Sequence, residues 1–357
     1  MRFFNLALIT AALSLFSGCY LAKQGSALIG QQMSAKSIDK MLKKDDISDE
    51  QREFFLLVQE IRAFAMDSIG LKSNKNYTKY VKLERDYIVD VVVASRDDSF
   101  EMYKWWFPVV GRVSYKGFFD RKDAVRQAEK ISKKGGYDVH IGAASAFSTL
   151  GFFSDPIYSF MTSYTVYDLA SLIIHEQLHA TVYIKGQTQL SEEMATFVGD
   201  EGGLLFVKMK YGEDSDQYKS AILSKEDYSA YISLMRSLYN ELKTVYESDI
   251  SREHKLAEKE RIITNFKNDV AQSYDSLFQT PRYKGLKSAN INNANIASRM
   301  TYNKDLSLFY ELYESRGRDM AKTVDELKAL KKVKKNHKEY LRGRIYTAPR
   351  HDLTLCR

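Results

Sequence analysis

Two histidines four positions apart, with a glutamate directly after the first, form the most promising candidate for a catalytic site in this chain. His175, Glu176 and His179 lie in the run IIHEQLHATVYIKG. On an α-helix, positions i and i+4 share one face, so both imidazoles can bind one cation while Glu176 projects beside it. A carboxylate in that place can act as a general base toward water. The pattern predicts one Zn²⁺ ion with His175 and His179 as ligands and Glu176 as a catalytic residue.

A third ligand is needed, because a catalytic zinc usually has three protein ligands and one open position. Glu192 follows in the run SEEMATFVGDEGG, at the start of a second expected helix that Ser191 would cap. Glu193 and Glu201 are the competing carboxylates, and we favour Glu192. The residues on the Glu192 side of this helix are small, which would let the two helices approach closely: Ala195, Thr196, Gly199, Gly202 and Gly203.

The helix that carries the histidines has independent signals in the sequence. Thr165 and Asp168 form a T-x-x-D capping box at its expected start. Lys185 and Gly186 supply a cationic last turn and a glycine stop. Apolar residues recur between them at helical spacing, so the segment is expected to be helical throughout.

The rest of the chain mixes strands and helices before residue 150 and is almost all helical from about residue 155. Periodicity and capping signals predict a helix over 49–69, strands over 86–95 and 137–144, a hairpin or two strands within 104–119, and a helix over 121–134. Beyond these we expect an antiparallel helix pair, 225–248 and 252–278, that turns near Ser251, and a basic helix over 328–344. The fold class is therefore α+β.

The first residues have the pattern of an export signal. MRFFNLALITAALSLFSGC has one early arginine, a short apolar run and small residues before Cys19, and its end resembles a bacterial lipobox. We expect residues 1–18 to be a signal peptide, Cys19 to carry a lipid, and 19–47 to be a tether with a short helix. This would anchor the protein to a membrane at the cell envelope, on the outer membrane or the periplasmic face.

Composition excludes several other classes of protein. The net charge is 53 − 46 = +7 over 357 residues, which is too weak a bias to indicate nucleic acid as a partner. Two cysteines cannot form a disulfide framework, and four prolines exclude a proline-rich linker. We expect a globular protein, taken as a monomer.

Several motifs together resemble one known family. The run LIIHEQLHATVYIKGQTQLSEEMATFV is similar to the core HExxHxxxYxxGxTxxNExxAT of bacterial lipoproteins described as putative aminopeptidases, and more broadly to gluzincin-type metallopeptidases. The likeness extends to WWFPVVGRVSYKGFF, AFSTLGFFSDP and NNANIASRMTYN, in this order along most of the chain. Ser191 stands where that family usually has asparagine. The resemblance implies a zincin-like fold, the ligands His175, His179 and Glu192, and peptide-bond hydrolysis, without distinguishing exopeptidase from endopeptidase action.

Further roles follow as expectations. Tyr302, in the run TYN that resembles the family, is the candidate donor to the oxyanion, with packing as its alternative. Asn292 and Asn293 are candidates for binding the substrate, with loop turns as the alternative. Residues 144–151 could form an edge strand that pairs with an extended peptide. The other histidines, His140, His254, His337 and His351, have no ligand spacing and are expected to be structural or on the surface.

We divide the chain into an α/β part over 48–150, a helical metallopeptidase part over 151–345 and a tail over 346–357. The expected function is zinc-dependent hydrolysis of a peptide or protein substrate. One alternative is a non-catalytic zinc-binding envelope lipoprotein that binds peptides or a partner. The other is a zinc amide hydrolase that acts on cell-wall peptides.

Overall fold

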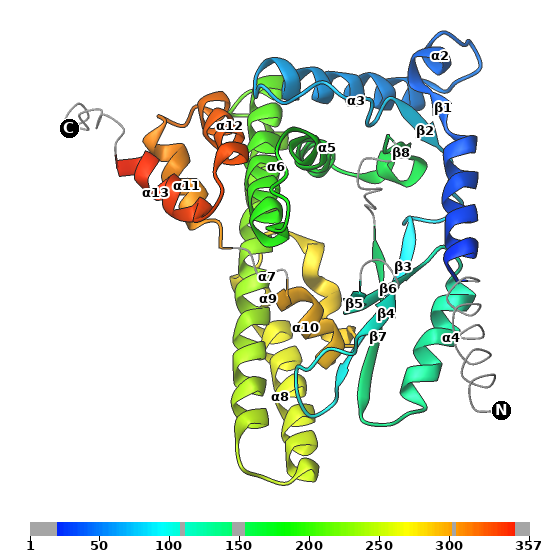
Figure 1. Cartoon of the computed structure of the whole chain (residues 1–357), viewed down its shortest axis with the longest axis vertical. Helices are drawn as coiled ribbons and strands as arrows, with labels where there is room; N and C mark the ends of the chain where they lie inside the picture. The colour runs from blue at the N-terminus through cyan, green and yellow to red at the C-terminus, as the bar shows by residue number, and fades with distance from the viewer. Residues whose placement is uncertain (1–19, 108–110, 145–153, 302–304, 347–357) are drawn as a thin grey trace, which may run out of the picture. The chain divides into compact units, whose positions relative to one another are not determined.

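The computed structural model describes residues 20–107, 111–144, 154–301 and 305–346 (Figure 1). The expected signal segment, Cys19 and most of the expected edge strand 144–151 lie outside these ranges. The described chain is α+β, as predicted, with helices predominating over small sheets. It forms two compact units that are interleaved along the sequence, so each contains residues from both of the expected parts.

Unit 1 comprises residues within 1–35, 81–148 and 227–301 and is built on an antiparallel sheet in the order β6-β3-β7. The central strand β3 (Val89–Arg96) pairs with β6 (Tyr115–Phe118) and with β7 (Tyr137–Ala144), and Val93 lies opposite His140. A hairpin of β4 (Trp105–Phe107) and β5 (Gly111–Val113) precedes β6. The predicted strand 137–144 is confirmed residue for residue.

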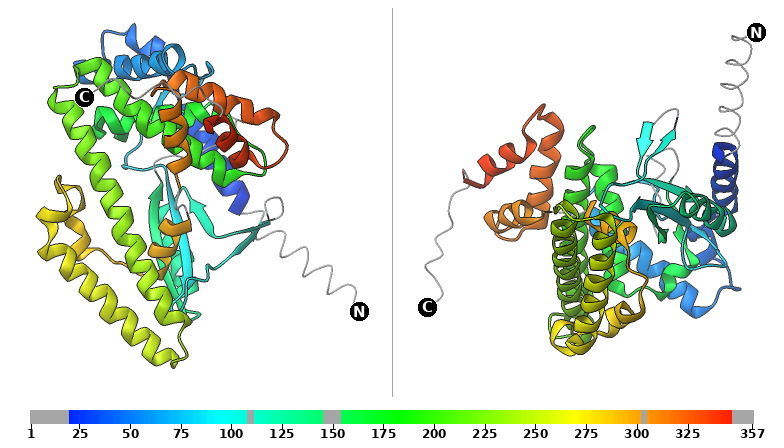
Figure 2. Two further views of the ribbon diagram at one scale, coloured as in Figure 1. Left: turned by 90° about the vertical axis from the view of Figure 1, so that its left-hand side faces the viewer. Right: turned by 90° about the horizontal axis from the view of Figure 1, so that it is seen from below.

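The two faces of this sheet are covered by different helices. Val92 and Ala94 of β3 pack against α4 (Arg121–Ser132), whose first turn Asp120 caps. The opposite face receives α10 (Asn293–Thr301). Unit 1 also contains the helix pair of α7 (Asp216–Glu247) from residue 227 onward and α8 (Arg252–Gln272), followed by α9 (Tyr274–Leu277) and η2 (Pro281–Ser288) (Figure 2).

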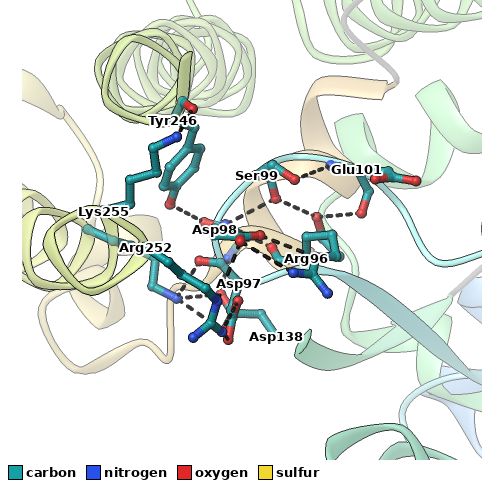
Figure 3. Close-up of polar contacts among 12 residues, drawn as sticks. Arg96, Asp97, Asp98, Ser99, Glu101, Asp138, Tyr246, Arg252 and Lys255 are labelled. Carbon is teal, nitrogen blue, oxygen red and sulfur yellow. Dashed lines mark hydrogen bonds and ion pairs between the residues drawn. The ribbon is translucent and has the colours of Figure 1, made fainter. Parts of the chain in front are cut away.

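A buried ion pair joins the helix pair to the sheet within unit 1. Lys259 of α8 is 5% exposed, and its Nζ lies 3.1 Å from Oδ2 of Asp138 on β7 and 3.1 Å from the carbonyl oxygen of Asp97. Asp138 also accepts the main-chain N–H of Asn293 at 2.8 Å. Around it, Arg252 donates to both carboxylate oxygens of Asp97 (Figure 3). Every charge in this group has an opposite charge or a hydrogen bond, as burial requires.

Unit 2 comprises residues within 36–80, 149–226 and 302–357. Its short sheet has the order β1-β2-β8, and its longest complete helices are α3, α5 and α6. The elements are β1 (Lys36–Ser37), α2 (Ile38–Leu42), α3 (Asp49–Asp67), β2 (Lys79–Val81), β8 (Ile157–Tyr158), η1 (Ser159–Ser163), α5 (Val166–Thr181), α6 (Thr188–Tyr211), α11 (Ser307–Ser315), α12 (Met320–Ala329), η3 (Leu330–Lys332) and α13 (His337–Tyr346).

Several element boundaries differ from the sequence prediction: β3 covers Val89–Arg96 rather than 86–95, α7 begins at Asp216 rather than at 225, and α8 ends at Gln272 rather than at 278. Two further differences have a visible cause in the fold. Helix α5 ends at Thr181 rather than at Lys185, because Val182 is extended and Lys331 donates to the carbonyl oxygen of Thr181 at 2.6 Å. The expected basic helix over 328–344 is instead the end of α12, a 3₁₀ turn and α13, with Asn336 at φ +57° before α13. The sequence prediction uses only local charge and periodicity, which carry no information about these tertiary contacts.

The start of the expected tether is structured. Residues 20–34 are helical, and the hydroxyl of Tyr20 donates to the carbonyl oxygen of Gly117 at 2.6 Å. The Tyr20 ring packs edge-on against Phe118. The residue directly after Cys19 is therefore attached to the sheet of unit 1. Within the described ranges, no helix has the length and apolar character needed to cross a bilayer.

Replacing Lys259 by methionine should destabilise unit 1 strongly, because it leaves the carboxylate of Asp138, which is only 17% exposed, without its cation. We expect a loss of about 3 kcal/mol or more in the free energy of unfolding, measured with chemical denaturant. Arg261→Met is the matched control on α8: Arg261 is exposed and pairs with Glu258, so a change below about 1 kcal/mol is expected. Equal effects of the two substitutions would contradict this account of the ion pair.

Candidate metal centre

Helix α5 presents the two histidines on its partly exposed side. Thr165 caps it as predicted, accepting the N–H of Asp168 at 3.0 Å. Leu169, Ile173, Ile174 and Leu178 are fully buried, which fixes the rotation of the helix. His175, Glu176 and His179 are half-buried, so they remain accessible to a small ligand.

Helix α6 begins at Thr188, three residues earlier than the expected cap, so the prediction that Ser191 caps it is wrong. Ser191 is buried and lies within the first turn. Its hydroxyl accepts the N–H of Ile184 at 3.1 Å and donates to the carbonyl oxygen of Gln187 at 3.0 Å. The serine thus fixes the turn between the two helices, which sets where Glu192 lies relative to α5.

The predicted small-residue face of α6 does pack against α5. A Cβ atom on Gly199 would lie 2.8 Å from the carbonyl oxygen of Ser171 and 3.0 Å from Cβ of His175. A Cβ on Gly203 would lie 3.1 Å from the main-chain nitrogen of Ser171, and one on Gly202 would meet Ile174. Any larger side chain at these positions would push the helices apart, so the glycines allow the close contact.

This contact brings together the three predicted ligands. Nε2 of His175 and Nε2 of His179 are 3.2 Å apart. The carboxylate oxygens of Glu192 lie 3.2 Å from Nε2 of His179 and 3.7 Å from Nε2 of His175. One ligand atom from each residue lies within 4.8 Å of the others, and no other group of three such side chains occurs in the described ranges.

The two competing carboxylates have lysine partners elsewhere in unit 2. Glu193 is 2% exposed, and its Oε2 lies 2.7 Å from Nζ of Lys338. Its Oε1 accepts a hydrogen bond from Gln189 at 2.9 Å. Glu201 forms an ion pair with Lys225. Both acids are neutralised within the protein, which leaves Glu192 as the carboxylate that faces the histidines.

The donor set suits a divalent cation that accepts nitrogen and oxygen ligands. Two imidazole nitrogens and a carboxylate converge, and their side chains keep 17–29% of their surface exposed, which leaves room for a further ligand. Nδ1 of His179 is buried without a hydrogen-bond partner among the described residues. The arrangement can bind a metal ion through Nε2 of each histidine, with Glu176 next to His175 as a base.

Two tyrosines that sequence reasoning did not single out lie near this group. Tyr77 is buried at φ +58°, an uncommon conformation for a bulky residue, and its N–H donates to the carbonyl oxygen of Asp155 at 2.6 Å. Burial, and then the negative charge of Glu176, raises the pKa of Tyr77. Tyr183 is 43% exposed, with its ring centroid 6.1 Å from that of His179. Only Tyr183 had a signal in the sequence, being four residues beyond His179.

The remaining expected site residues are placed differently. Tyr302 lies outside the described residues. Asn292 and Asn293 lie in unit 1, where Asn292 donates to the carbonyl oxygen of Val139 at 3.0 Å and the amide of Asn293 bonds to Tyr246, Arg96 and Ser99. Their role in substrate binding stays a prediction.

The comparison with known proteins gives one match. A family model described as "Putative aminopeptidase" matches residues 19–341. No curated protein and no solved structure matches the chain. The matched range includes the three converging residues His175, His179 and Glu192.

Gly199→Ala should separate α5 from α6 and disturb the ligand group. We expect the protein to lose about 1–3 kcal/mol of stability and to bind zinc more weakly, as measured by thermal unfolding and by competition with a chromogenic chelator. Gly343→Ala is the control, since a Cβ on this glycine of α13 would meet nothing within 4 Å. If Gly199→Ala kept the stability and the zinc affinity of the wild-type protein, the close approach of α5 and α6 would not be required for zinc binding.

The substitutions Glu192→Ala and Glu193→Ala test which of the two adjacent glutamates is the zinc ligand. We expect zinc affinity to fall more than about 100-fold in Glu192→Ala, which exceeds the usual effect of losing a residue that only supports a ligand. Glu193→Ala should lose stability through its lysine partner but still bind one equivalent of zinc, as determined by elemental analysis after dialysis. The opposite result would make Glu193 the ligand.

Proposed function

The chain belongs to the family described as "Putative aminopeptidase", and from this premise we propose that it is a zinc-dependent metallopeptidase of the cell envelope. The observation that carries the proposal is the convergence of His175, His179 and Glu192, with Glu176 directly beside the first of them. The family description supports hydrolysis of peptides. The donor set supports zinc, which takes histidine and glutamate together at catalytic sites.

In this proposal the three ligands hold one zinc ion through the two Nε2 atoms and the carboxylate of Glu192. When bound, zinc supplies a Lewis acid that polarises a carbonyl group and lowers the pKa of a water molecule to about 7. Leu169, Ile173 and Leu178 keep the histidine side of α5 directed to the site, because they hold its other side in the core.

Glu176 moves the proton. Its carboxylate accepts a proton from the attacking water and then donates it to the nitrogen of the leaving amine, so the amine departs neutral. Glu176 is half-buried, in a place where water can reach it but bulk solvent does not surround it. Burial and then the negative charge of this carboxylate raise the pKa of Tyr77.

The family description favours removal of residues from the amino terminus of the substrate, while the ligand group itself suits exo- and endopeptidases equally. An aminopeptidase also needs an acidic group for the free amine of the substrate.

The oxyanion role of Tyr302 remains part of the proposal and rests on the sequence alone. The location at the envelope rests on the sequence up to Cys19, whose lipid would anchor the protein at the membrane surface.

Glu176→Gln tests the proposal while preserving the shape of the side chain. We expect zinc to remain bound and kcat to fall about 10²–10⁴-fold, because the amide cannot accept the proton. The measurement is the digestion of a peptide library followed by kinetics on the best substrate, with and without a zinc chelator.

Glu213→Gln is the control for the loss of a glutamate in unit 2, since Glu213 is exposed and pairs with Lys208. It should retain full activity. Undiminished turnover in Glu176→Gln would exclude this residue as the base. Absence of chelator-sensitive digestion by the wild-type protein would favour the non-catalytic alternative.

A further inference from the structure

A second candidate site lies in unit 1, outside the histidine group. It is a cavity of about 620 Å³, within the usual range for sites that bind small organic molecules. Residues of α4, β7, α7, α10 and the segment around η2 line it. Val139 and Ile141 of β7 pack toward α4, whereas His140 contacts Asn295 of α10. The cavity therefore follows the outer edge of β7, where one strand presents side chains from both of its faces.

The walls of the cavity are largely apolar. They include aliphatic side chains from four of the elements that surround it: Val125, Ile141, Met235, Leu286 and Ile291. A ligand with only polar groups would gain nothing from these walls. A ligand with an apolar body would remove them from water, at roughly 25 cal/mol for each Å² of apolar surface.

One positive charge in the lining is available to a ligand. Arg121 forms an ion pair with Asp90, whose side chain is fully buried. Arg299 of α10 is exposed and forms no ion pair among the described residues, and its guanidinium lies 5.2 Å from the ring centroid of Tyr231. Stacking on an aromatic ring restricts the side chain while leaving its N–H donors free for an anion.

The positive charges of the lining also act on His140. Burial, followed by the positive charges of Arg299 and Arg121, lowers the pKa of His140. The imidazole is therefore neutral near pH 7, and its Nε2 lies 3.4 Å from Nδ2 of Asn295. An anion next to Arg299 would oppose these charges. Glu129 also lines the cavity from α4, so one negative charge on the ligand is favoured over two.

We propose that this cavity binds a small organic molecule that has one carboxylate and an apolar body, with the carboxylate paired to Arg299. The site is separate from the proposed peptidase chemistry, since every residue that lines it belongs to unit 1. The apolar walls receive the body of the ligand, and Tyr231 holds the guanidinium in place.

The test uses 4-phenylbutyrate as the probe and 4-phenylbutan-1-ol as its uncharged counterpart, titrated into the full-length protein by calorimetry. We expect saturable binding of the carboxylate, and binding of the alcohol about tenfold weaker or more. Arg299→Met should weaken carboxylate binding by a similar factor. Arg126→Met is the matched control, because Arg126 is an exposed arginine of α4 that pairs with Asp123 and does not line the cavity.

NMR spectroscopy of the histidine rings locates the bound probe. The carboxylate should shift the His140 resonances and raise the pKa of His140, because its charge offsets that of Arg299. Carboxylate binding that persists in Arg299→Met would place the probe elsewhere, for example at the zinc ligands, and would overturn the proposal. Absence of binding at millimolar concentration, or equal binding of the alcohol, would overturn it as well.

Discussion

The close approach of α5 and α6 is the constraint on which the candidate metal centre depends. Glutamate is a short ligand, so Glu192 can reach the histidines of the neighbouring helix only when the two backbones nearly touch. Gly199 and Gly203 permit this, because even a methyl group at either position would collide with Ser171. The candidate metal centre is thus a consequence of helix packing, together with the turn that Ser191 fixes between the two helices.

Charge neutralisation explains which carboxylate faces the histidines. Adjacent glutamates on a helix point in different directions, and a buried acid is costly unless a cation compensates it. Glu193 lies in the core with Lys338, and Glu201 is paired with Lys225. Glu192 is paired with neither lysine and is directed to two imidazoles, a set of donors that suits a divalent cation.

Much of this arrangement could be predicted from local sequence, because its signals are local. The spacing of His175 and His179 fixes a shared helix face, and the cap at Thr165 is a short-range hydrogen bond. The start of α6 was mispredicted because Ser191 looks like a cap in sequence but bonds to the preceding turn in the fold. Tyr77 could not be found at all, since it reaches the vicinity of Glu176 only through tertiary structure.

Zinc coordination is the central claim, and X-ray absorption spectroscopy of the zinc-loaded protein tests it most directly. The account predicts one zinc ion per chain, bound by two imidazole nitrogens and by oxygen atoms of Glu192 and of one exchangeable water, at distances of about 2.0–2.1 Å. A spectrum without imidazole scattering, or with a fourth protein ligand in place of the water, would contradict it.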